Sequence, residues 1–224
     1  MNSPGRKRST RDRPAKAPLS EDAIVDAALT LLQSEGLEAV TMRRVAAVLD
    51  TGAASLYVYV SGREGLLHAM QERITASIEL DSPDPSRWRD QLHSLLQRML
   101  RALVAHPGIA AATMAVPPTS PAVLRLLENL LGILLAGGVD PQDAAWAADV
   151  LALLVTYAAM EDDMHVHRDD EAGKFFSLFA GLSPREFPLI TTHAAQLVAG
   201  DGDERFHFAI DVVIDGLLAR AARR

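Results

Sequence analysis

The chain has 224 residues, of which 49% are hydrophobic, so it is long enough for a small domain and one larger domain with a substantial core. It contains no cysteine, which excludes disulfide bonds and cysteine-ligated zinc and is compatible with a reducing compartment. The net charge of −7 would oppose binding to nucleic acid if the charges were evenly spread.

The charges are unevenly spread along the chain. Residues 1–75 hold 10 Lys/Arg and 9 Asp/Glu, whereas the remaining residues hold 12 and 20. Six of the basic residues lie between Arg6 and Lys16, where Asp12 is the one acidic residue. This arm, residues 1–18, lacks apolar periodicity and is expected to be disordered when free. Two roles stay open for it: lying along a DNA minor groove, or acting as a solubilising tail.

The first helix is expected to start after Ser20, whose hydroxyl can cap it, with Glu21 and Asp22 in the first turn. Its apolar residues recur on one face, and Gly36 is expected to end it. The members of this stripe are Ile24, Ala27, Ala28, Leu31 and Leu32.

Residues 41–60 read as two short helices joined by a tight turn. Thr41 can cap the first of them, and Asp50-Thr51-Gly52 interrupts the apolar pattern where a turn needs flexible residues. Leu56 and Val60 form the inward pair of the second segment. The residues between the turn and Leu56 are small, so the backbone can approach a DNA groove closely. This pattern predicts a helix-turn-helix.

A further helix is expected to start at once, because residues 61–64, Ser-Gly-Arg-Glu, have the form of a capping box. The N-terminus of that helix, with Arg63 beside it, suits a DNA phosphate. The alternative reading is that three small helices make an ordinary helical subdomain without DNA-binding function.

Residues 20–75 resemble the N-terminal domain of the TetR family of bacterial transcriptional repressors. The resemblance rests on residues in the family's order and spacing: Thr41, Arg43, Val45, Ala46, Leu49, Ser55, Leu56, Tyr57, Tyr59, Val60, Arg63, Leu66 and Leu67. Two positions depart from the family pattern, since Asp50 stands where glycine is common and Tyr59 where histidine is common. Asp tolerates left-handed backbone angles better than most residues, whereas Tyr59 alters which bases are read.

The resemblance implies that ten residues contact DNA. Thr41 would brace the motif, Arg43, Arg44 and Arg63 would meet phosphates or bases, and the two tyrosines would reach the backbone and base edges. The full set is Thr41, Arg43, Arg44, Gly52, Ala53, Ala54, Ser55, Tyr57, Tyr59 and Arg63.

The chain beyond residue 80 reads as helical throughout, with no β-alternation and no internal repeat. A linker at residues 81–85 precedes a helix expected from Ser86. Ser120-Pro121 and Asp140-Pro141 each place a capping residue before a proline suited to the first helical position. Residues 165–173 are polar and are expected to form a loop, Ser183-Pro184 is expected to start a helix, and Asp203 is expected to open the last one.

Two of these helices are too apolar for a monomer. Trp146, Val150, Leu153, Leu154 and Tyr157 accompany many alanines on the long helix, and the last helix adds Phe208 and Val212 to its inward stripe. A helix that is apolar on nearly every side must be buried on several sides. We therefore expect a homodimer paired through these two helices. The best candidate for a membrane span, residues 144–160, is interrupted by Asp149 and falls short of about 20 apolar residues, so no membrane segment is expected. No apolar segment follows the basic arm, so no secretory signal is expected and the protein is expected to be cytoplasmic.

The C-terminal part resembles the tetracycline-repressor branch of the family, through its helical layout, the Leu-Glu-Asn at residues 127–129 and Glu161-Asp162. In that branch a histidine before a Pro-Thr turn holds the magnesium that arrives with the drug. Here Thr113 takes that place, with the turn at Pro118-Thr119. Only the architecture carries over, and no metal or cofactor is expected.

A family member of this design holds a small molecule inside the larger domain. Polar or soft side chains among apolar helices are the candidates for the pocket, and they suggest a largely hydrophobic effector. They are His93, Gln97, His106, Met114, Asn129, Thr156, Tyr157 and Met160.

A metal-binding protein or an enzyme is the competing interpretation. It would use the acidic and histidine residues between Glu161 and Glu171, including Asp162, Asp163, His165, His167, Asp169 and Asp170. Such a cluster at the end of a helix is more typical of a solvated face, and the chain has no standard catalytic motif. The sequence thus predicts an all-α protein that is not an enzyme. It has a disordered arm (1–18), a DNA-binding domain (19–80, with its motif at 41–60) and a ligand-binding and dimerisation domain (81–224). Its function is that of a repressor that binds a palindromic double-stranded operator and is released by a small hydrophobic effector.

Overall fold

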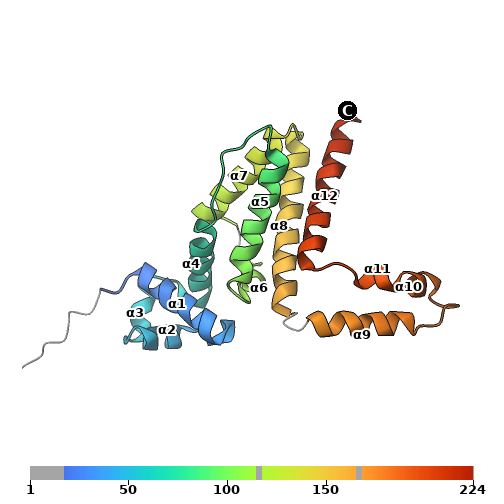
Figure 1. The fold of residues 1–224 in the computed structure, drawn as a ribbon. Coiled ribbons are helices and arrows are strands. Elements are labelled where there is room, and N and C mark those ends of the chain that lie inside the picture. The colour runs from blue at the N-terminus through green and yellow to red at the C-terminus, as the bar shows by residue number, and fades with distance from the viewer. Residues whose placement is uncertain (1–17, 115–117, 165–167, 224) are drawn as a thin grey trace, which may run out of the picture.

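The computed structural model describes residues 18–114, 118–164 and 168–223, and across these residues every regular element is a helix. The prediction of an all-α fold is confirmed. Figure 1 shows a small head formed by α1 to α4, a bundle of longer helices that follows the end of α4, and an arm that leaves the bundle after α8. The basic segment expected to be disordered lies, apart from Pro18, outside the described residues.

The head contains α1 (Glu21–Glu35), a 3-10 turn (Leu37–Ala39), α2 (Met42–Val48), α3 (Ala53–Leu56) and α4 (Gly62–Ala76). Both predicted N-caps are confirmed, because Ser20 Oγ accepts a hydrogen bond from the Ala23 amide at 3.2 Å and Thr41 Oγ1 accepts one from the Arg44 amide at 3.3 Å. The apolar stripe predicted for α1 is buried in a core that also includes Leu56, Val60, Leu66 and Met70.

The turn of the motif depends on Asp50, whose φ of 49° lies in the left-handed region. The second helix of the motif is shorter than its sequence pattern suggests, because α3 ends at Leu56 and a turn carries the chain from Tyr57 to Val60. α4 begins where predicted, but the Ser61 side chain makes no capping hydrogen bond, so the capping box expected there is wrong.

The bundle consists of α5 (Trp88–Val104), α6 (Ile109–Thr113), α7 (Pro121–Ala136), α8 (Pro141–Met164) and α12 (Gly202–Ala221). Ser120 Oγ and Asp140 Oδ1 accept hydrogen bonds from the amides of Val123 and Gln142, so both predicted cap-then-proline starts are confirmed. The core of the bundle is formed by leucine, isoleucine, valine and alanine side chains of α5, α7, α8 and α12.

Two helix starts in the bundle differ from the sequence prediction. α5 begins at Trp88 rather than Ser86, because the amide and hydroxyl of Ser86 both donate to Asp84 Oδ1, at 2.8 and 2.7 Å. These two hydrogen bonds lower the pKa of the Asp84 carboxyl. α12 begins at Gly202 rather than Asp203, because Asp201 is its N-cap and forms a capping box with Glu204.

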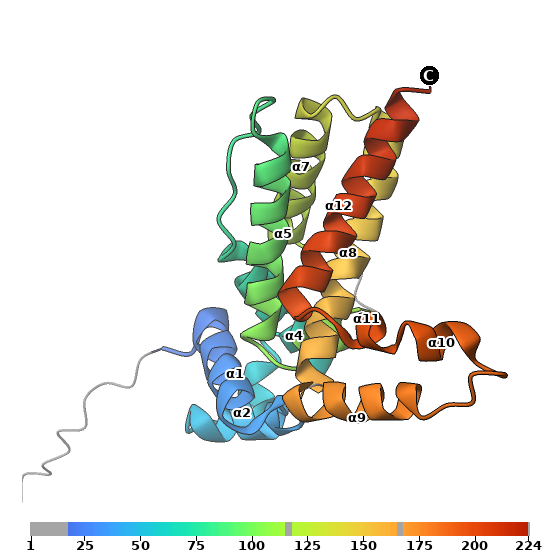
Figure 2. The ribbon, with the colours of Figure 1, turned by 45° about the vertical axis from the view of Figure 1, so that its right-hand side comes forward.

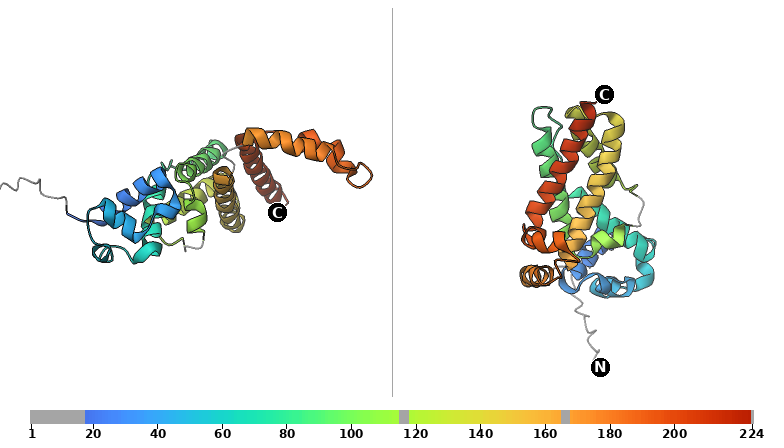
Figure 3. Two further views of the ribbon diagram at one scale, coloured as in Figure 1. Left: turned by 90° about the horizontal axis from the view of Figure 1, so that it is seen from below. Right: turned by 90° about the vertical axis from the view of Figure 1, so that its right-hand side faces the viewer.

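The arm contains α9 (Arg168–Ala180), α10 (Pro188–Thr192) and α11 (Ala194–Val198), which pack mainly against one another. Figures 1, 2 and 3 agree that it extends away from the bundle beyond α12. The prediction of a loop over residues 165–173 is wrong from Arg168 onward, because α9 begins there. The three acidic residues at 169–171 are of the type favoured in the first turn of a helix. The prediction that a helix starts after Ser183 is also wrong. Only one turn forms there, and the next proline, Pro188, holds Phe187 outside the helical region at φ −126° and ψ 57°.

The head and the bundle are packed together as well as linked through α4. Ile109 of α6 is 1% exposed and belongs to the hydrophobic core of the head. Gly108, at φ 81°, lies so close to the head that a β-carbon at this position would stand 3.2 Å from Leu37 Cβ. The Glu72 carboxylate of α4 accepts a hydrogen bond from the Ala122 amide in the first turn of α7, at 2.9 Å. The head and the bundle therefore share packing contacts and a hydrogen bond in addition to their covalent link.

Candidate functional site

The residues expected to contact DNA come from three consecutive parts of the head, namely the start of α2, α3 with its following turn, and the start of α4. In Figure 1 this region lies at the end of the molecule remote from the C-terminus. Thr41 and Ala53 are half-buried, and the other eight predicted residues are exposed. Tyr57 and Tyr59 expose 58% and 41% of their surface, whereas the neighbouring Leu56 is fully buried in the core of the head. The fold therefore presents the tyrosines to solvent on a rigid support.

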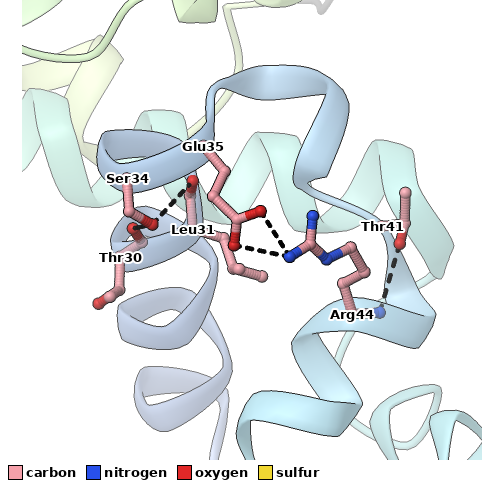
Figure 4. A network of polar contacts seen from close by, with 6 residues as sticks. All are labelled: Thr30, Leu31, Ser34, Glu35, Thr41 and Arg44. Atoms are coloured by element: carbon pink, nitrogen blue, oxygen red, sulfur yellow. Dashed lines mark hydrogen bonds and ion pairs between the residues drawn. The ribbon is translucent and has the colours of Figure 1, made fainter.

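The three predicted arginines of this surface differ in their partners. Figure 4 shows the Arg44 guanidinium turned toward Glu35, with Nη2 at 2.6 Å from both carboxylate oxygens. Arg63 Nε donates to the Val40 carbonyl at 3.4 Å, which orients this side chain along the 3-10 turn. Arg43 is exposed and bonds to none of the described residues. Arg43 is thus the guanidinium that is immediately free for a phosphate.

Val58 was not singled out in the sequence, yet it is 81% exposed between the two tyrosines. A large apolar side chain in this position can contact a thymine methyl group in the major groove. The sequence did contain a sign of this: Val58 is apolar but does not share the inward helical spacing of Leu56 and Val60.

A cavity of about 290 Å³ lies between α4, α5, α6, α7 and α8. Its walls are mainly apolar, and its polar lining residues are Gln71, Thr75, Asp149 and Thr156. The apolar lining residues include Ile74, Ile78, Met99, Leu103, Ile109 and Leu126. A mainly apolar concavity with a few polar groups is typical of a small-molecule site.

Two of the eight residues expected in the pocket, Met114 and Thr156, line this cavity. The other six lie elsewhere, as follows. His93 and Gln97 face α12, where they lie 3.0 Å from Asp211 Oδ1 and 2.8 Å from His207 Nε2. His106 Nδ1 is 2.8 Å from the Ala102 carbonyl.

Asn129 holds the linker that precedes α5, because its side-chain amide donates to the Asp81 carbonyl at 2.7 Å. Tyr157 is 63% exposed on α8, and Met160 is half-buried near the end of that helix, outside the cavity lining. His93, Gln97, His106 and Asn129 thus have structural partners. The sequence could not predict this, because a polar position on an apolar helix does not specify which neighbouring helix it faces.

Sequence reasoning missed Gln71, Thr75 and Asp149 as cavity residues. The first two lie on α4, which was interpreted as part of the DNA-binding domain alone. Asp149 interrupts the apolar stretch of α8, and this interruption was the feature of the sequence that could have indicated a residue facing a ligand.

α8 and α12 each carry a row of exposed apolar side chains. On α8, Trp146, Val150, Leu153 and Tyr157 are 49–63% exposed, and on α12 Phe208 and Val212 are 68% and 54% exposed. Figure 1 shows the two helices side by side along the bundle. Side chains of this size are rarely left in contact with water over a continuous patch.

α8 also meets the length and composition of a membrane span, over residues Pro141–Glu161 with a mean hydropathy of 1.4. The expectation that this stretch is too short to span is therefore wrong by length. Core helices meet the same criteria, and Ala144, Leu151 and Val155 of α8 are completely buried in the bundle.

The acidic and histidine cluster of the competing interpretation is described only in part, since the side chains from Asp162 to Glu171 lie outside the described part of the structure. Among the residues that are described, no group of three histidine or acidic side chains is arranged to hold a metal ion.

Family models match both parts of the chain. The model of the family "Bacterial regulatory proteins, tetR family" matches residues 24–70, and that of the family "Tetracyclin repressor-like, C-terminal domain" matches residues 82–221. The chain therefore belongs to the TetR family of bacterial regulatory proteins, and it is a ligand-responsive, DNA-binding transcriptional regulator. The interpretation as a metal protein or enzyme is not favoured.

Individual relatives extend over nearly the whole chain. An HTH-type transcriptional regulator of Saccharopolyspora erythraea is 29% identical and covers 92% of this chain and 87% of its own. The HTH-type transcriptional repressor DrrR1 of Streptomyces coeruleorubidus is 28% identical over 96% of this chain and 84% of its own. The crystal structure of apo ActR from Streptomyces coelicolor has a TM-score of 0.87 at 32% identity, covering 93% of this chain and 99% of its own. ActR has also been crystallised with actinorhodin.

Proposed function

We propose that this protein is a homodimeric repressor that binds a palindromic operator through the exposed residues of α2, α3 and the start of α4. An apolar effector in the cavity between α4 and α8 releases it from DNA. As a DNA-binding regulator without an enzymatic activity of its own, it would act in the cytoplasm. The relatives described as repressors and the complex of ActR with actinorhodin support a repressor with a small-molecule effector.

One observation carries the link between effector and DNA: Ile74 and Ile109 belong both to the core of the head and to the wall of the cavity. A molecule that displaces either side chain changes the packing of the head against the bundle. The effector shifts the equilibrium only if it binds the released arrangement more tightly than the DNA-bound one.

Dimerisation through α8 and α12 would bury the apolar face of these helices and fix the separation of the two heads. Two heads on one face of DNA read half-sites about one helical turn, or roughly 34 Å, apart.

The test is binding of the purified protein to fragments of the intergenic DNA upstream of its own gene, measured by fluorescence anisotropy across a salt series. Tight, salt-sensitive binding to a palindromic footprint is expected. Arg43→Ala should weaken binding to specific and random DNA alike and reduce the salt slope by about one phosphate contact.

Arg185→Ala is the matched control, because Arg185 is also an exposed arginine and lies in the arm, remote from the head. It should leave the affinity and the salt slope unchanged. If Arg43→Ala and Arg185→Ala had the same effect, the proposed DNA-binding surface would be wrong.

A further inference from the structure

The effector cavity has an unusual charge distribution. Asp149 is its one charged lining residue among the described residues, and the other polar lining groups, Gln71, Thr75 and Thr156, are neutral. The Thr156 hydroxyl already donates to the Ala152 carbonyl at 2.8 Å. Asp149 lines the cavity and is also exposed to solvent, so its carboxylate stays hydrated and is accessible to a ligand that enters the cavity.

Asp149 makes no hydrogen bond or ion pair with any of the described residues, whereas the other acid near the start of α8 is paired. Asp143 is 3% exposed and accepts hydrogen bonds from Nε and Nη2 of Arg220 on α12, at 3.1 and 2.9 Å. The chain thus pairs its structural carboxylate on α8 internally. It leaves the second carboxylate unpaired at the cavity, in a stretch of helix where every neighbour within a turn is uncharged.

We propose that the effector is an apolar molecule with a cationic amine and that Asp149 binds the amine by a charge-assisted hydrogen bond. This inference rests on the proposed function, since it assigns the chemical class of the same effector. The apolar body would lie against Ile78, Met99 and Leu126, and the amine would point toward α8. Val150 and Leu153 flank Asp149, and their burial in the proposed dimer would exclude water from the ion pair and strengthen it.

The experiment compares three fluorescent probes on one skeleton: 9-(aminomethyl)anthracene, 9-anthracenemethanol and 9-anthracenecarboxylate. Their dissociation constants are measured at pH 7 with the full-length dimer by the anisotropy of the anthracene itself. The amine is expected to bind about tenfold tighter than the alcohol, as one charge-assisted hydrogen bond predicts, and the carboxylate should bind weakest. Asp149→Asn should abolish the preference for the amine and retain binding of the alcohol.

Glu128→Gln, which removes an exposed acid of α7 outside the cavity, is the control for a general effect of negative charge and should retain the preference. Equal binding of amine and carboxylate, an unchanged preference in Asp149→Asn, or no binding of any probe would overturn the inference. So would loss of the dimer in Asp149→Asn with the preference intact, because Asp149 would then serve the interface. Operator binding is measured separately: a protein that prefers the amine but does not bind DNA contradicts the proposed function alone.

Discussion

Arg44 shows how a residue expected to bind DNA can already have a partner within the head. Its ion pair with Glu35 joins the start of α2 to the end of α1, and both side chains remain 44–45% exposed. Exposed pairs of this kind contribute about 0 to 1 kcal/mol, so a DNA phosphate can compete for the guanidinium. We therefore expect Glu35 to weaken DNA binding in two ways, because it occupies Arg44 and because its negative charge repels phosphates.

Glu35→Gln should accordingly increase affinity for DNA, by up to about fivefold given the modest strength of an exposed pair. The salt dependence should become steeper, because Arg44 would then displace an additional counterion. Anisotropy titrations at several salt concentrations measure both effects. Glu38→Gln, which removes an exposed acid of the adjacent 3-10 turn, is the control for charge alone, and an equal gain in that variant would contradict the role of Arg44.

Tyr59 is the residue at which this chain departs from the common histidine of its family. Tyr59→Ala should weaken binding to the operator more than binding to random DNA, since base-edge contacts carry sequence preference and phosphate contacts do not. The far-ultraviolet circular dichroism and the melting temperature should be unchanged, because the side chain is 41% exposed. Equal losses on both DNAs would assign Tyr59 to the phosphate backbone instead.

At the scale of helices, the ion pair between Asp143 and Arg220 fastens the end of α12 to the start of α8. Asp143→Asn should lower the free energy of unfolding by about 1 to 3 kcal/mol, since it weakens hydrogen bonds to a charged group at a buried oxygen. Chemical denaturation measures this change. Asp215 of α12 forms an exposed ion pair with Arg89 of α5, so Asp215→Asn should have a much smaller effect. Similar losses in the two variants would mean that burial of Asp143 contributes nothing.

The helices could be predicted where a local signal decides the structure. Ser20, Thr41 and Ser120 cap as predicted because an N-cap needs only a hydroxyl and an amide three residues apart. The predictions at Ser86 and Ser183 failed because a competing interaction nearby prevailed: the Asp84 carboxylate in one case, and the restriction that Pro188 places on Phe187 in the other.

The two candidate sites also differ in how far a local stretch of sequence determines them. The DNA-binding surface could be proposed from the sequence because its residues lie within a 23-residue segment, Thr41 to Arg63. The cavity could not, because five helices contribute to it and the sequence does not specify which polar side chains face inward. His93 and Asp149 are both polar residues on apolar helices, yet the first faces α12 and the second faces the cavity.

At the scale of the whole molecule, the exposed face of α8 and α12 requires a partner, and a second copy is the proposed one. Trp146→Glu should convert the dimer to a monomer at micromolar concentration and strongly reduce operator binding, because one head alone contacts one half-site. Light scattering coupled to size-exclusion chromatography measures the mass. Leu124→Glu places the same charge on an exposed leucine of α7 and should leave the dimer intact. A monomeric wild-type protein would contradict the proposal.

The contact of Gly108 and Ile109 with the head has a consequence for how such regulators diversify. A domain joined only by a linker can be exchanged between proteins by recombination at that linker. Here Ile109 completes the core of the head, and both the positive φ of 81° and the closeness of Leu37 favour glycine at position 108. A chimaera that joins a foreign head at residue 80 would therefore lack a matched contact at α6. New operator specificity is more readily acquired by substitutions on the exposed surface of the head than by exchange of the head itself.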